Sequence, residues 1–283
     1  MGMFAVGQPV PREEDPRLLR GRGDFIADKN VAGQAYACLL RSPHAHARIV
    51  SLDANRALGM PGVIAVFTGD NLAADHLGMR KTHFPRKRPD GSPMFENPHP
   101  GLARDEVRFA GDPVAYVLAE TLAQARDAAE AIDVEYQPLP AVVHSEDAIA
   151  TAAPAVWADC PDNISHVFEV GDKTAVEAAF ARADHITRQR FVISRIGMHA
   201  IEPRGCIGEY DSSTGRYTLH SCIGNTHVAR AILAGEVFGI AENRLRVVSG
   251  DIGGTFGSKG TTSNENILAL WAARRIDRPV KWV

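Results

Sequence analysis

The sequence has 283 residues, of which 45% are hydrophobic and 23% are charged, and its formal net charge is −3. Such a chain can bury a sizeable core, and its length predicts two domains rather than one. The small net charge gives no reason to expect nucleic acid as a partner, and the basic cluster Arg80, Lys81, Arg86, Lys87 and Arg88 lies in a Pro-rich stretch that predicts a solvated loop.

Residues 1–24 are rich in Pro, Arg, Glu and Asp, so they predict an extended arm laid over another part of the molecule. Short apolar runs then predict strands over residues 35–40, 47–52, 63–68, 113–119 and 132–136. Two helices are predicted behind capping residues, one from Asp53 to about Leu58 and one after Thr121 over residues 122–131. A Pro- and Gly-rich surface loop is expected over residues 75–104. This mixture predicts an α+β domain over residues 25–147.

The stretch Ala148–Pro154 is rich in Ala and Pro and predicts a linker to a second domain over residues 155–283. The strands expected in this domain cover residues 186–192, 206–210, 216–220 and 244–249. The expected helices cover residues 174–183, 227–238 and 264–275. Gly239 stands where a C-terminal cap of the second helix belongs. Residues 280–283 start a further strand, which predicts that the polypeptide continues elsewhere or that a partner covers this edge.

The four cysteines, Cys38, Cys160, Cys206 and Cys222, are widely spaced and form no Cys-x-x-Cys pair. A zinc site, an iron–sulfur cluster held by this chain alone and a disulfide framework are therefore not expected. The N-terminus lacks the basic-then-apolar pattern of a signal peptide, and no apolar run approaches the roughly 20 residues of a membrane span. We expect a cytoplasmic protein.

The strongest candidate site is the glycine-rich stretch Gly250–Gly260, which joins a predicted strand to a predicted helix. Glycines let the main chain approach a ligand and adopt positive φ, and the N–H groups of such a loop can face an anion. The stretch fits neither the P-loop pattern nor the dinucleotide-binding pattern. Two interpretations stay open, an anion cradle of another kind and a tight turn without a ligand. His227 and Arg230 are candidates to hold an anion or to pair with Asp251.

Three further residues have both a functional and a structural interpretation. His44 and His46 alternate along a predicted strand, so they are candidates for a pair of metal ligands or for a structural pair at the edge of the core. Glu202 is a candidate for a buried acid near a cofactor or for a hydrogen-bond acceptor within the fold.

Residues 253–259, which read Gly-Gly-Thr-Phe-Gly-Ser-Lys, resemble the Gly-Gly-Gly-Phe-Gly-Gly-Lys stretch of the xanthine dehydrogenase, aldehyde oxidase and aerobic carbon-monoxide dehydrogenase family of molybdenum hydroxylases. Other stretches resemble this family in the same order: the N-terminal arm at 12–23, the a/b hammerhead domain at 41–49, 61–63 and 111–115, and the first molybdopterin-binding domain at 202–205 and 278–282. The resemblance implies the N-terminal portion of a molybdopterin-binding large subunit, with an α+β fold in which a hammerhead domain precedes an incomplete molybdopterin-binding domain.

The resemblance implies an oxidoreductase component that oxidises a small carbonyl, heterocyclic or CO-like substrate with oxygen from water. The implied cofactor is molybdenum–molybdopterin in the cytosine dinucleotide form, approached by Gly253, Gly254, Thr255, Phe256, Gly257 and Gly224. The implied partners are a second molybdopterin-binding polypeptide, an iron–sulfur subunit with 2Fe-2S clusters and an FAD subunit. The family's catalytic glutamate is expected beyond residue 283, so the isolated chain is expected to be inactive.

Two positions depart from the family's pattern. When the sequences are aligned on His227 and Arg230, Gly224 takes the position of a glutamine that contacts the molybdenum centre in the family. Thr255 replaces the middle glycine of the loop, and its β-branched side chain adds bulk and resists a positive φ. These departures favour an alternative, a non-catalytic assembly module that has lost cofactor binding. The intact Phe-Gly pair of the loop and the N-terminal arm favour the enzyme component.

Overall fold

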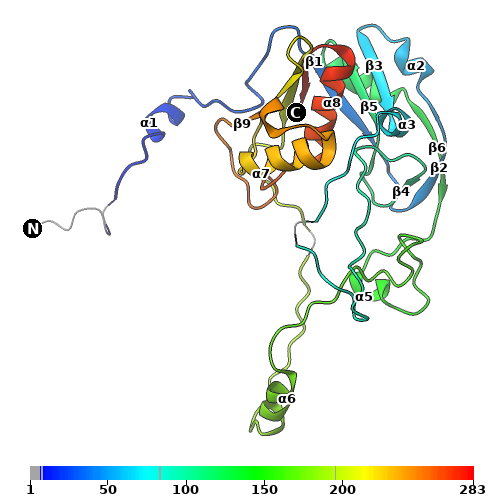
Figure 1. The fold of residues 1–283 in the computed structure, drawn as a ribbon, viewed down its shortest axis with the longest axis vertical. Coiled ribbons are helices and arrows are strands. Elements are labelled where there is room, and N and C mark those ends of the chain that lie inside the picture. Colours follow the sequence, from blue (N-terminus) through cyan, green and yellow to red (C-terminus); the bar gives the residue numbers. More distant parts are fainter. Residues whose placement is uncertain (1–6, 8, 83, 195) are drawn as a thin grey trace, which may run out of the picture.

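The computed structural model describes residues 7, 9–82, 84–194 and 196–283. Its body contains a seven-stranded sheet with the order β3-β5-β1-β10-β7-β8-β9 and a three-stranded sheet with the order β4-β2-β6 (Figure 1). The strands are β1 (Ala35–Arg41), β2 (Ala47–Asp53), β3 (Val63–Thr68), β4 (Glu106–Val107), β5 (Pro113–Ala119), β6 (Asp133–Pro138), β7 (Cys206–Asp211), β8 (Arg216–Ser221), β9 (Leu245–Val248) and β10 (Val280–Trp282). The helices are α1 (Asp15–Leu18), α2 (Asn55–Leu58), α3 (Gly69–Ala74), α4 (Leu122–Glu130), α5 (Ser145–Ala148), α6 (Lys173–Ala181), α7 (Thr226–Ala231), the π-helix η1 (Ile232–Phe238), the 3-10 helix η2 (Glu242–Arg244) and α8 (Asn264–Ile276).

Strand β10 joins the two regions that the sequence predicts as separate domains. It pairs in parallel with β1, where Ala35 lies opposite Val280, and antiparallel with β7 on its other side. Val280 is buried, and the buried Lys281 donates hydrogen bonds to the carbonyl oxygens of Ala27 and Lys29, each 2.7 Å away. The strand predicted from residue 280 is therefore a central strand, and backbone pairing is continuous from β3 to β9.

Helices α8 and α4 cover opposite faces of the larger sheet. All seven residues of β5 are buried, and successive side chains of a strand point to opposite faces. Tyr116 and Leu118 lie in one hydrophobic cluster with Leu268 of α8. Ala115 and Val117 lie in another cluster, with alanines of α4. Burial on both faces explains why β5 is an unbroken apolar run in the sequence.

Both of these helices begin where the sequence predicts. At the start of α4, the Thr121 hydroxyl oxygen accepts a hydrogen bond from the backbone N–H of Gln124, 3.2 Å away. A capping box between Ser263 and Asn266 starts α8, and residues 265–273 of that helix are all buried. Because α8 has no solvated face along this stretch, its side chains take part in two hydrophobic clusters. The helix therefore connects these two clusters.

The helix predicted over residues 227–238 consists of two parts. Regular α-helical bonding in α7 is followed by the wider π-helical bonding of η1. Gly239 ends the helix in the left-handed region, with a φ of 60°, as predicted for a C-terminal cap. Neither this helix nor any other in the described part of the chain is long and apolar enough to cross a membrane.

The loop after α3 is largely exposed, as predicted, and Lys81, Arg86 and Lys87 are exposed, but two of its arginines contact other segments. Arg80 donates hydrogen bonds to the carbonyl oxygen of Thr262, at 2.9 Å, and to the side-chain oxygen of Asn264, at 3.1 Å. Arg88 forms an ion pair with Asp162. These two arginines hold the loop against other segments, because their guanidinium groups find partners that are distant in the sequence.

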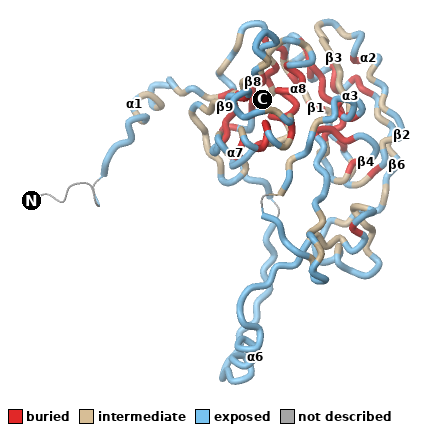
Figure 2. Tube along the Cα trace, viewed as in Figure 1, coloured by how far each residue is buried: buried red, intermediate tan, exposed pale blue. Residues whose placement is uncertain are grey.

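A segment that contains α6 projects away from the body, and Figure 2 shows it exposed along its length. Residues 166–194 and 196–199 are all exposed. The strand predicted over residues 186–192 is wrong, since the described residues show neither a strand there nor a neighbouring strand to pair with it. An apolar stretch forms a strand only where another strand takes up its N–H and C=O groups.

Strand β7 passes so close to α8 that only glycine fits at position 208. A Cβ atom at Gly208 would lie 2.4 Å from the carbonyl carbon of Ala269 and 2.5 Å from its carbonyl oxygen. We expect Gly208→Ala to lower the free energy of unfolding in urea by about 1–3 kcal/mol, because backbone atoms cannot move aside. Gly235→Ala is the matched control, since nothing lies within 4 Å of a Cβ atom there. Equal stability of the two variants would contradict this close packing.

Candidate functional site

The glycine-rich stretch Gly250–Gly260 connects β9 to α8 and has an unusual backbone. Gly254 and Gly257 adopt positive φ values of 102° and 91°, which glycine tolerates without strain. Phe256 also lies in the left-handed region, with a φ of 44°, and is 69% exposed. A non-glycine residue in this region persists only where its surroundings hold the backbone in place. The φ of Thr255 is not positive, so its β-branched side chain does not cause the strain that the sequence predicts.

The backbone N–H groups at the centre of this loop are open. Within the described residues, no acceptor is hydrogen-bonded to the N–H groups of residues 254–257. The flanking N–H groups do have acceptors: that of Gly253 donates to the carboxylate of Glu202, and that of Ser258 donates to the carbonyl oxygen of Thr255, each at 2.8 Å. Consecutive open amides between a strand and a helix can bind an electronegative group.

Glu202 is buried beneath the loop and accepts three hydrogen bonds, two from the loop and one from Ile26. Its Oε2 atom lies 2.8 Å from the backbone nitrogen of Gly253 and 2.8 Å from Nζ of Lys259. Its Oε1 atom lies 3.3 Å from the backbone nitrogen of Ile26. The residues Glu202 and Lys259 are 8% and 3% exposed, so their charges are paired away from water. The interpretation of Glu202 as a hydrogen-bond acceptor within the fold is confirmed.

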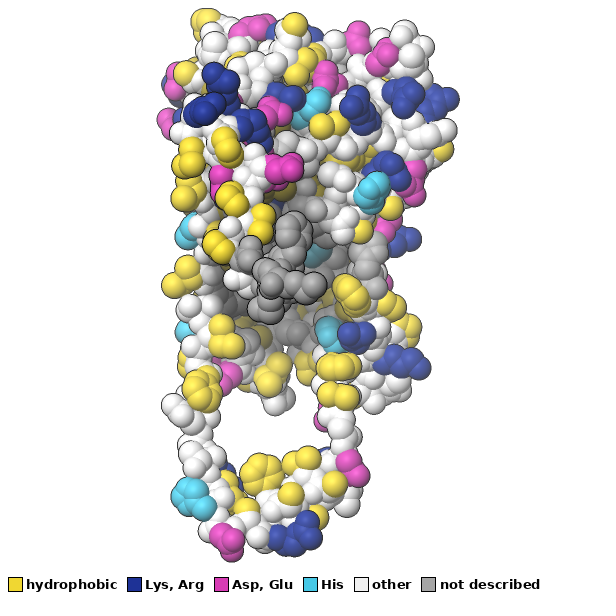
Figure 3. Space-filling view, turned by 90° about the vertical axis from the view of Figure 1, so that its left-hand side faces the viewer, with side chains coloured by type: hydrophobic (Ala, Val, Ile, Leu, Met, Phe, Trp, Pro, Cys, Tyr) yellow, Lys and Arg dark blue, Asp and Glu magenta, His cyan; other side chains and the backbone are white. Residues whose placement is uncertain are grey.

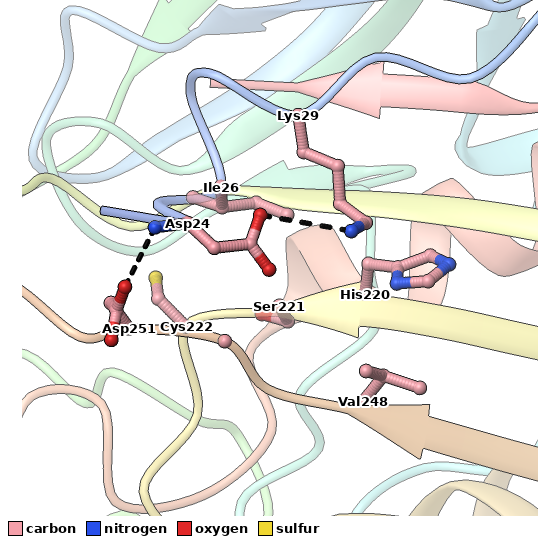
Figure 4. A pocket seen from close by; sticks show the side chains of 9 residues that line it. Asp24, Ile26, Lys29, His220, Ser221, Cys222, Val248 and Asp251 are labelled. Carbon is pink, nitrogen blue, oxygen red and sulfur yellow. Dashed lines mark hydrogen bonds and ion pairs between the residues drawn. The ribbon is translucent and has the colours of Figure 1, made fainter. Parts of the chain in front are cut away.

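Asp251, at the start of the loop, is bound by the N-terminal arm. Arg17 donates two hydrogen bonds to its carboxylate, at 2.6 and 2.7 Å, and the N–H of Asp24 donates a third at 2.6 Å (Figure 4). The Arg17 hydrogen bonds, followed by that of Asp24, lower the pKa of Asp251 to about 2. The expected pairing of Asp251 with Arg230 is wrong, because Arg17 takes that position and Arg230 bonds to Glu242 at 2.9 Å.

Gly224 lies beside the loop, although it is distant from it in the sequence. Its N–H donates to the carbonyl oxygen of Lys259 at 2.9 Å. A Cβ atom at this position would lie 3.6 Å from that oxygen and 4.0 Å from Cγ2 of Thr255, which is ordinary contact distance. The structure therefore brings the six predicted site residues, Gly224 and Gly253–Gly257, into one place.

Two small cavities border the loop. One measures ≈ 20 Å³ and lies where the arm meets β8, with Asp24, Lys29, His220, Cys222 and Asp251 among its lining residues (Figure 4). The other measures ≈ 10 Å³ and lies on the side of Arg204 and Lys259. Each has room for about one water molecule. A larger ligand at this loop must therefore bind on its open side, where Phe256 is exposed.

The histidine pair makes structural contacts. The ring nitrogens of His46 contact the carbonyl oxygen of Pro140, at 2.7 Å, and the carboxylate of Glu106. The ring of His44 packs on that of Tyr136, with centroids 5.0 Å apart. In the part of the chain that the structure describes, no group of three or more His, Cys, Asp or Glu side chains is arranged to hold a metal ion.

No sequence pattern reveals the partners of three residues that bind around the loop. Ile26 contributes only its backbone N–H, which any residue except proline supplies. Arg17 lies 234 residues before its partner Asp251. Lys259 is the single lysine of the loop, and its partner Glu202 lies 57 residues earlier. The one indication in the sequence is Lys259 itself, because a charged residue in a glycine-rich loop without a charged neighbour is expected to pair with a residue elsewhere in the chain.

Two family models match the sequence. The model of the aldehyde oxidase and xanthine dehydrogenase a/b hammerhead domain matches residues 20–140, and that of the molybdopterin cofactor-binding domain matches residues 156–283. Among curated proteins, the chain is 34% identical to the nicotine 6-hydroxylase large subunit of Paenarthrobacter nicotinovorans, over 98% of this chain and 33% of the relative. It is 32% identical to the carbon monoxide dehydrogenase large chain of Afipia carboxidovorans, over 98% of this chain and 34% of the relative.

The fold is similar to solved structures of the same group. Quinoline 2-oxidoreductase from Pseudomonas putida 86 superposes with a TM-score of 0.87 at 34% identity, over 98% of this chain and 34% of that one. The Cu,Mo-CO dehydrogenase in its carbon monoxide reduced state superposes with a TM-score of 0.84 at 30% identity, over 98% and 35%. The chain thus spans about a third of the length of these relatives.

The low pKa of Asp251 predicts how the arm contributes to stability as the pH changes. Because this pKa lies at about 2 in the fold, against an ordinary value of 3.8, the ionised carboxylate stabilises the fold fully above pH ~4 and ceases to do so as the pH falls through about 2. The difference in urea unfolding midpoint between the native sequence and Asp251→Asn should be constant from neutral pH down to this window and then shrink. Arg17→Met should weaken this pH dependence. A difference that is the same at pH ~3 and pH ~7 would rule out the arm–loop contact as its source.

Proposed function

The chain belongs to the aldehyde oxidase and xanthine dehydrogenase family of molybdenum hydroxylases, and we propose that it is the part of the large subunit that presents the glycine-rich loop to the molybdenum cofactor. The complete enzyme would oxidise a small carbonyl, heterocyclic or CO-like substrate with oxygen from water. One observation carries this proposal: the open amides of residues 254–257 lie next to Gly224 on a loop that is held rigidly from below.

The described residues fit such a cofactor by the chemistry of their donors. Uncharged amides without an acceptor among the described residues can donate hydrogen bonds to electronegative atoms without bringing a competing charge. When bound, the cofactor supplies the two-electron redox centre of the hydroxylation. The N–H groups of residues 254–257 would orient it, and the exposed ring of Phe256 would exclude water from the same side of the loop.

The projecting segment supports a role as one part of a larger assembly. Figure 3 shows hydrophobic side chains gathered on it, at the bottom of the view. Its exposed apolar residues include Phe168, Phe180, Phe191, Val192, Ile193 and Ile196. Large exposed apolar surfaces mark interaction sites. We propose that this surface contacts the second molybdopterin-binding region, whether that region lies on the same polypeptide or on another.

The names of the relatives support a role in a complex of several subunits. One relative is named as the gamma subunit of the 6-hydroxypseudooxynicotine dehydrogenase complex, and others are named as large chains or large subunits. We propose an iron–sulfur subunit with 2Fe-2S clusters and an FAD subunit as electron acceptors for this chain, the cytosine dinucleotide form of the cofactor, and a cytoplasmic location.

The alternative, a non-catalytic assembly module, rests on Gly224 and Thr255. The geometry weakens both arguments. Thr255 adopts no positive φ and so adds no strain to the loop. Gly224 still bonds to the loop through its backbone N–H, and a Cβ atom there would make only ordinary contacts, at 3.6 Å and beyond. We therefore prefer the enzyme component.

The test is the molybdenum and pterin content of the native complex, purified from its host through this polypeptide. Molybdenum and the fluorescent oxidised pterin should both be present in stoichiometric amounts. If the partner polypeptides co-purify but molybdenum and pterin are absent, the enzyme proposal fails and the assembly module takes its place.

The close approach of Gly253 to Glu202 gives a sharper prediction. A Cβ atom at Gly253 would lie 2.5 Å from Cβ of Glu202, whereas nothing lies within 4 Å of a Cβ atom at Gly235, outside the site. Gly253→Ala must displace the loop, so we expect the activity of the complete enzyme to fall on the order of 10²-fold, as for a catalytic group misplaced by about 1 Å. Gly235→Ala, the control, should retain its activity. Equal activities of the two variants would show that the position of the loop does not matter for turnover.

A further inference from the structure

We propose that the buried ion pair between Glu202 and Lys259 is the positioning element of the glycine-rich loop, and that it aims the open N–H groups of residues 254–257 at the bound cofactor. The identity of the ligand rests on the function proposed above, whereas the mechanical role of the pair does not. The two charged groups meet 2.8 Å apart, with side-chain exposures of 2% for Lys259 and 7% for Glu202.

A single carboxylate oxygen holds both ends of the loop. Oε2 of Glu202 accepts from the N–H of Gly253, before the open amides, and from Nζ of Lys259, after them. The backbone of Glu202 adds a further bond, since its N–H donates to the carbonyl oxygen of Gly253 at 3.3 Å. The carbonyl oxygen of Lys259 accepts from Gly224. The five residues between Gly253 and Lys259 are therefore held at both ends by the same carboxylate.

The loop needs such an anchor because its own residues do not define its shape. Gly254 and Gly257 use conformations that glycine reaches freely, and glycine is the most flexible residue in the unfolded chain. Phe256 holds a conformation that costs free energy, so something outside the residue must maintain it. An apolar contact would bury the same area without fixing a direction, whereas a charge-assisted hydrogen bond fixes both distance and direction.

Stability alone is a poor explanation for this pair. Desolvating two charges offsets much of their attraction, and well-packed apolar residues often serve a core equally well. A geometric role explains why the pair lies under a loop whose central amides are open. The other oxygen of Glu202 accepts from Ile26, so the same carboxylate also holds the chain directly after the N-terminal arm. Loss of its charge should loosen the loop and the arm together.

Glu202→Gln tests the proposal because it keeps the shape of the side chain but leaves Lys259 as an unpaired buried cation. The loop should open to bring this cation to water. Trypsin cleaves after lysine, so cleavage between Lys259 and Gly260 in the folded protein reports that opening directly. Glu265→Gln is the control matched in burial: Glu265 has a side-chain exposure of 4% and pairs with Arg41 and Arg204, not with a residue of the loop.

The experiment uses the complete molybdenum subunit with its co-purified partners, and it has two independent readouts. The first is loop opening, measured by cleavage at Lys259 and by hydrogen exchange of the bonded N–H groups of Gly224, Gly253 and Ser258, which should speed up at least about tenfold in Glu202→Gln and remain unchanged in Glu265→Gln. The second is cofactor geometry, measured by molybdenum and pterin content and by the Mo(V) electron paramagnetic resonance signal, which should be reduced or shifted only in Glu202→Gln.

The outcomes separate this proposal from the function on which its ligand rests. Unchanged cleavage, exchange and Mo(V) signal in a folded Glu202→Gln variant would overturn the positioning role. An unmodified complex without molybdenum and pterin would overturn the proposed function, and the loop-opening readout would still decide the mechanical role. If Glu202→Gln does not fold, Lys259→Arg and Lys259→Met replace it. The arginine variant must keep slow exchange and the methionine variant must lose it, and equal exchange in the two would refute the pair's role.

Discussion

The charge of Glu202 must be compensated where it is buried, and the groups that compensate it connect three segments that are distant in the sequence. The carboxylate accepts from Ile26, directly after the N-terminal arm, and from Gly253 and Lys259 towards the two ends of the glycine-rich loop. A buried carboxylate without these donors would be strongly unfavourable, so the arm and the loop fold against each other as one unit. Asp251 repeats the arrangement closer to the surface, with Arg17 and Asp24 as its donors. Glu202 bonds to the loop only at Gly253 and Lys259, so the N–H groups of residues 254–257 between them have no acceptor among the described residues.

The larger sheet supplies the rigid frame on which this unit stands. Strand β10 lies between β1 and β7 and so connects the region matched by the hammerhead model with the region matched by the molybdopterin-binding model. Helix α8 packs against β7 through Gly208 and starts directly after the loop, while β9 ends directly before it. Both ends of the loop are therefore attached to elements whose side chains are buried in a common core. A site held in this way can maintain a strained residue such as Phe256 at an exposed position.

Local features of the fold were predictable from the sequence, because they depend on neighbouring residues. The apolar runs of β3 and β5, the cap at Thr121 and the left-handed Gly239 all match their predicted positions. The glycine-rich loop was recognisable from composition and family resemblance. Contacts between distant residues were not: Arg230 pairs with Glu242 instead of Asp251, and residues 186–192 form no strand, because each outcome depends on which partner the fold brings near. The ion pair between Glu202 and Lys259 belongs to the same class, since neither residue reveals its partner in the sequence.

The measurement that tests this account most directly is an experimental structure of the complete molybdenum subunit with its cofactor bound. The account predicts that the N–H groups of residues 254–257 donate hydrogen bonds to the molybdenum end of the cofactor, while Glu202 still bridges Gly253 and Lys259 beneath the loop. A cofactor that binds away from these amides, or a loop that leaves Glu202 when the cofactor is present, would contradict it.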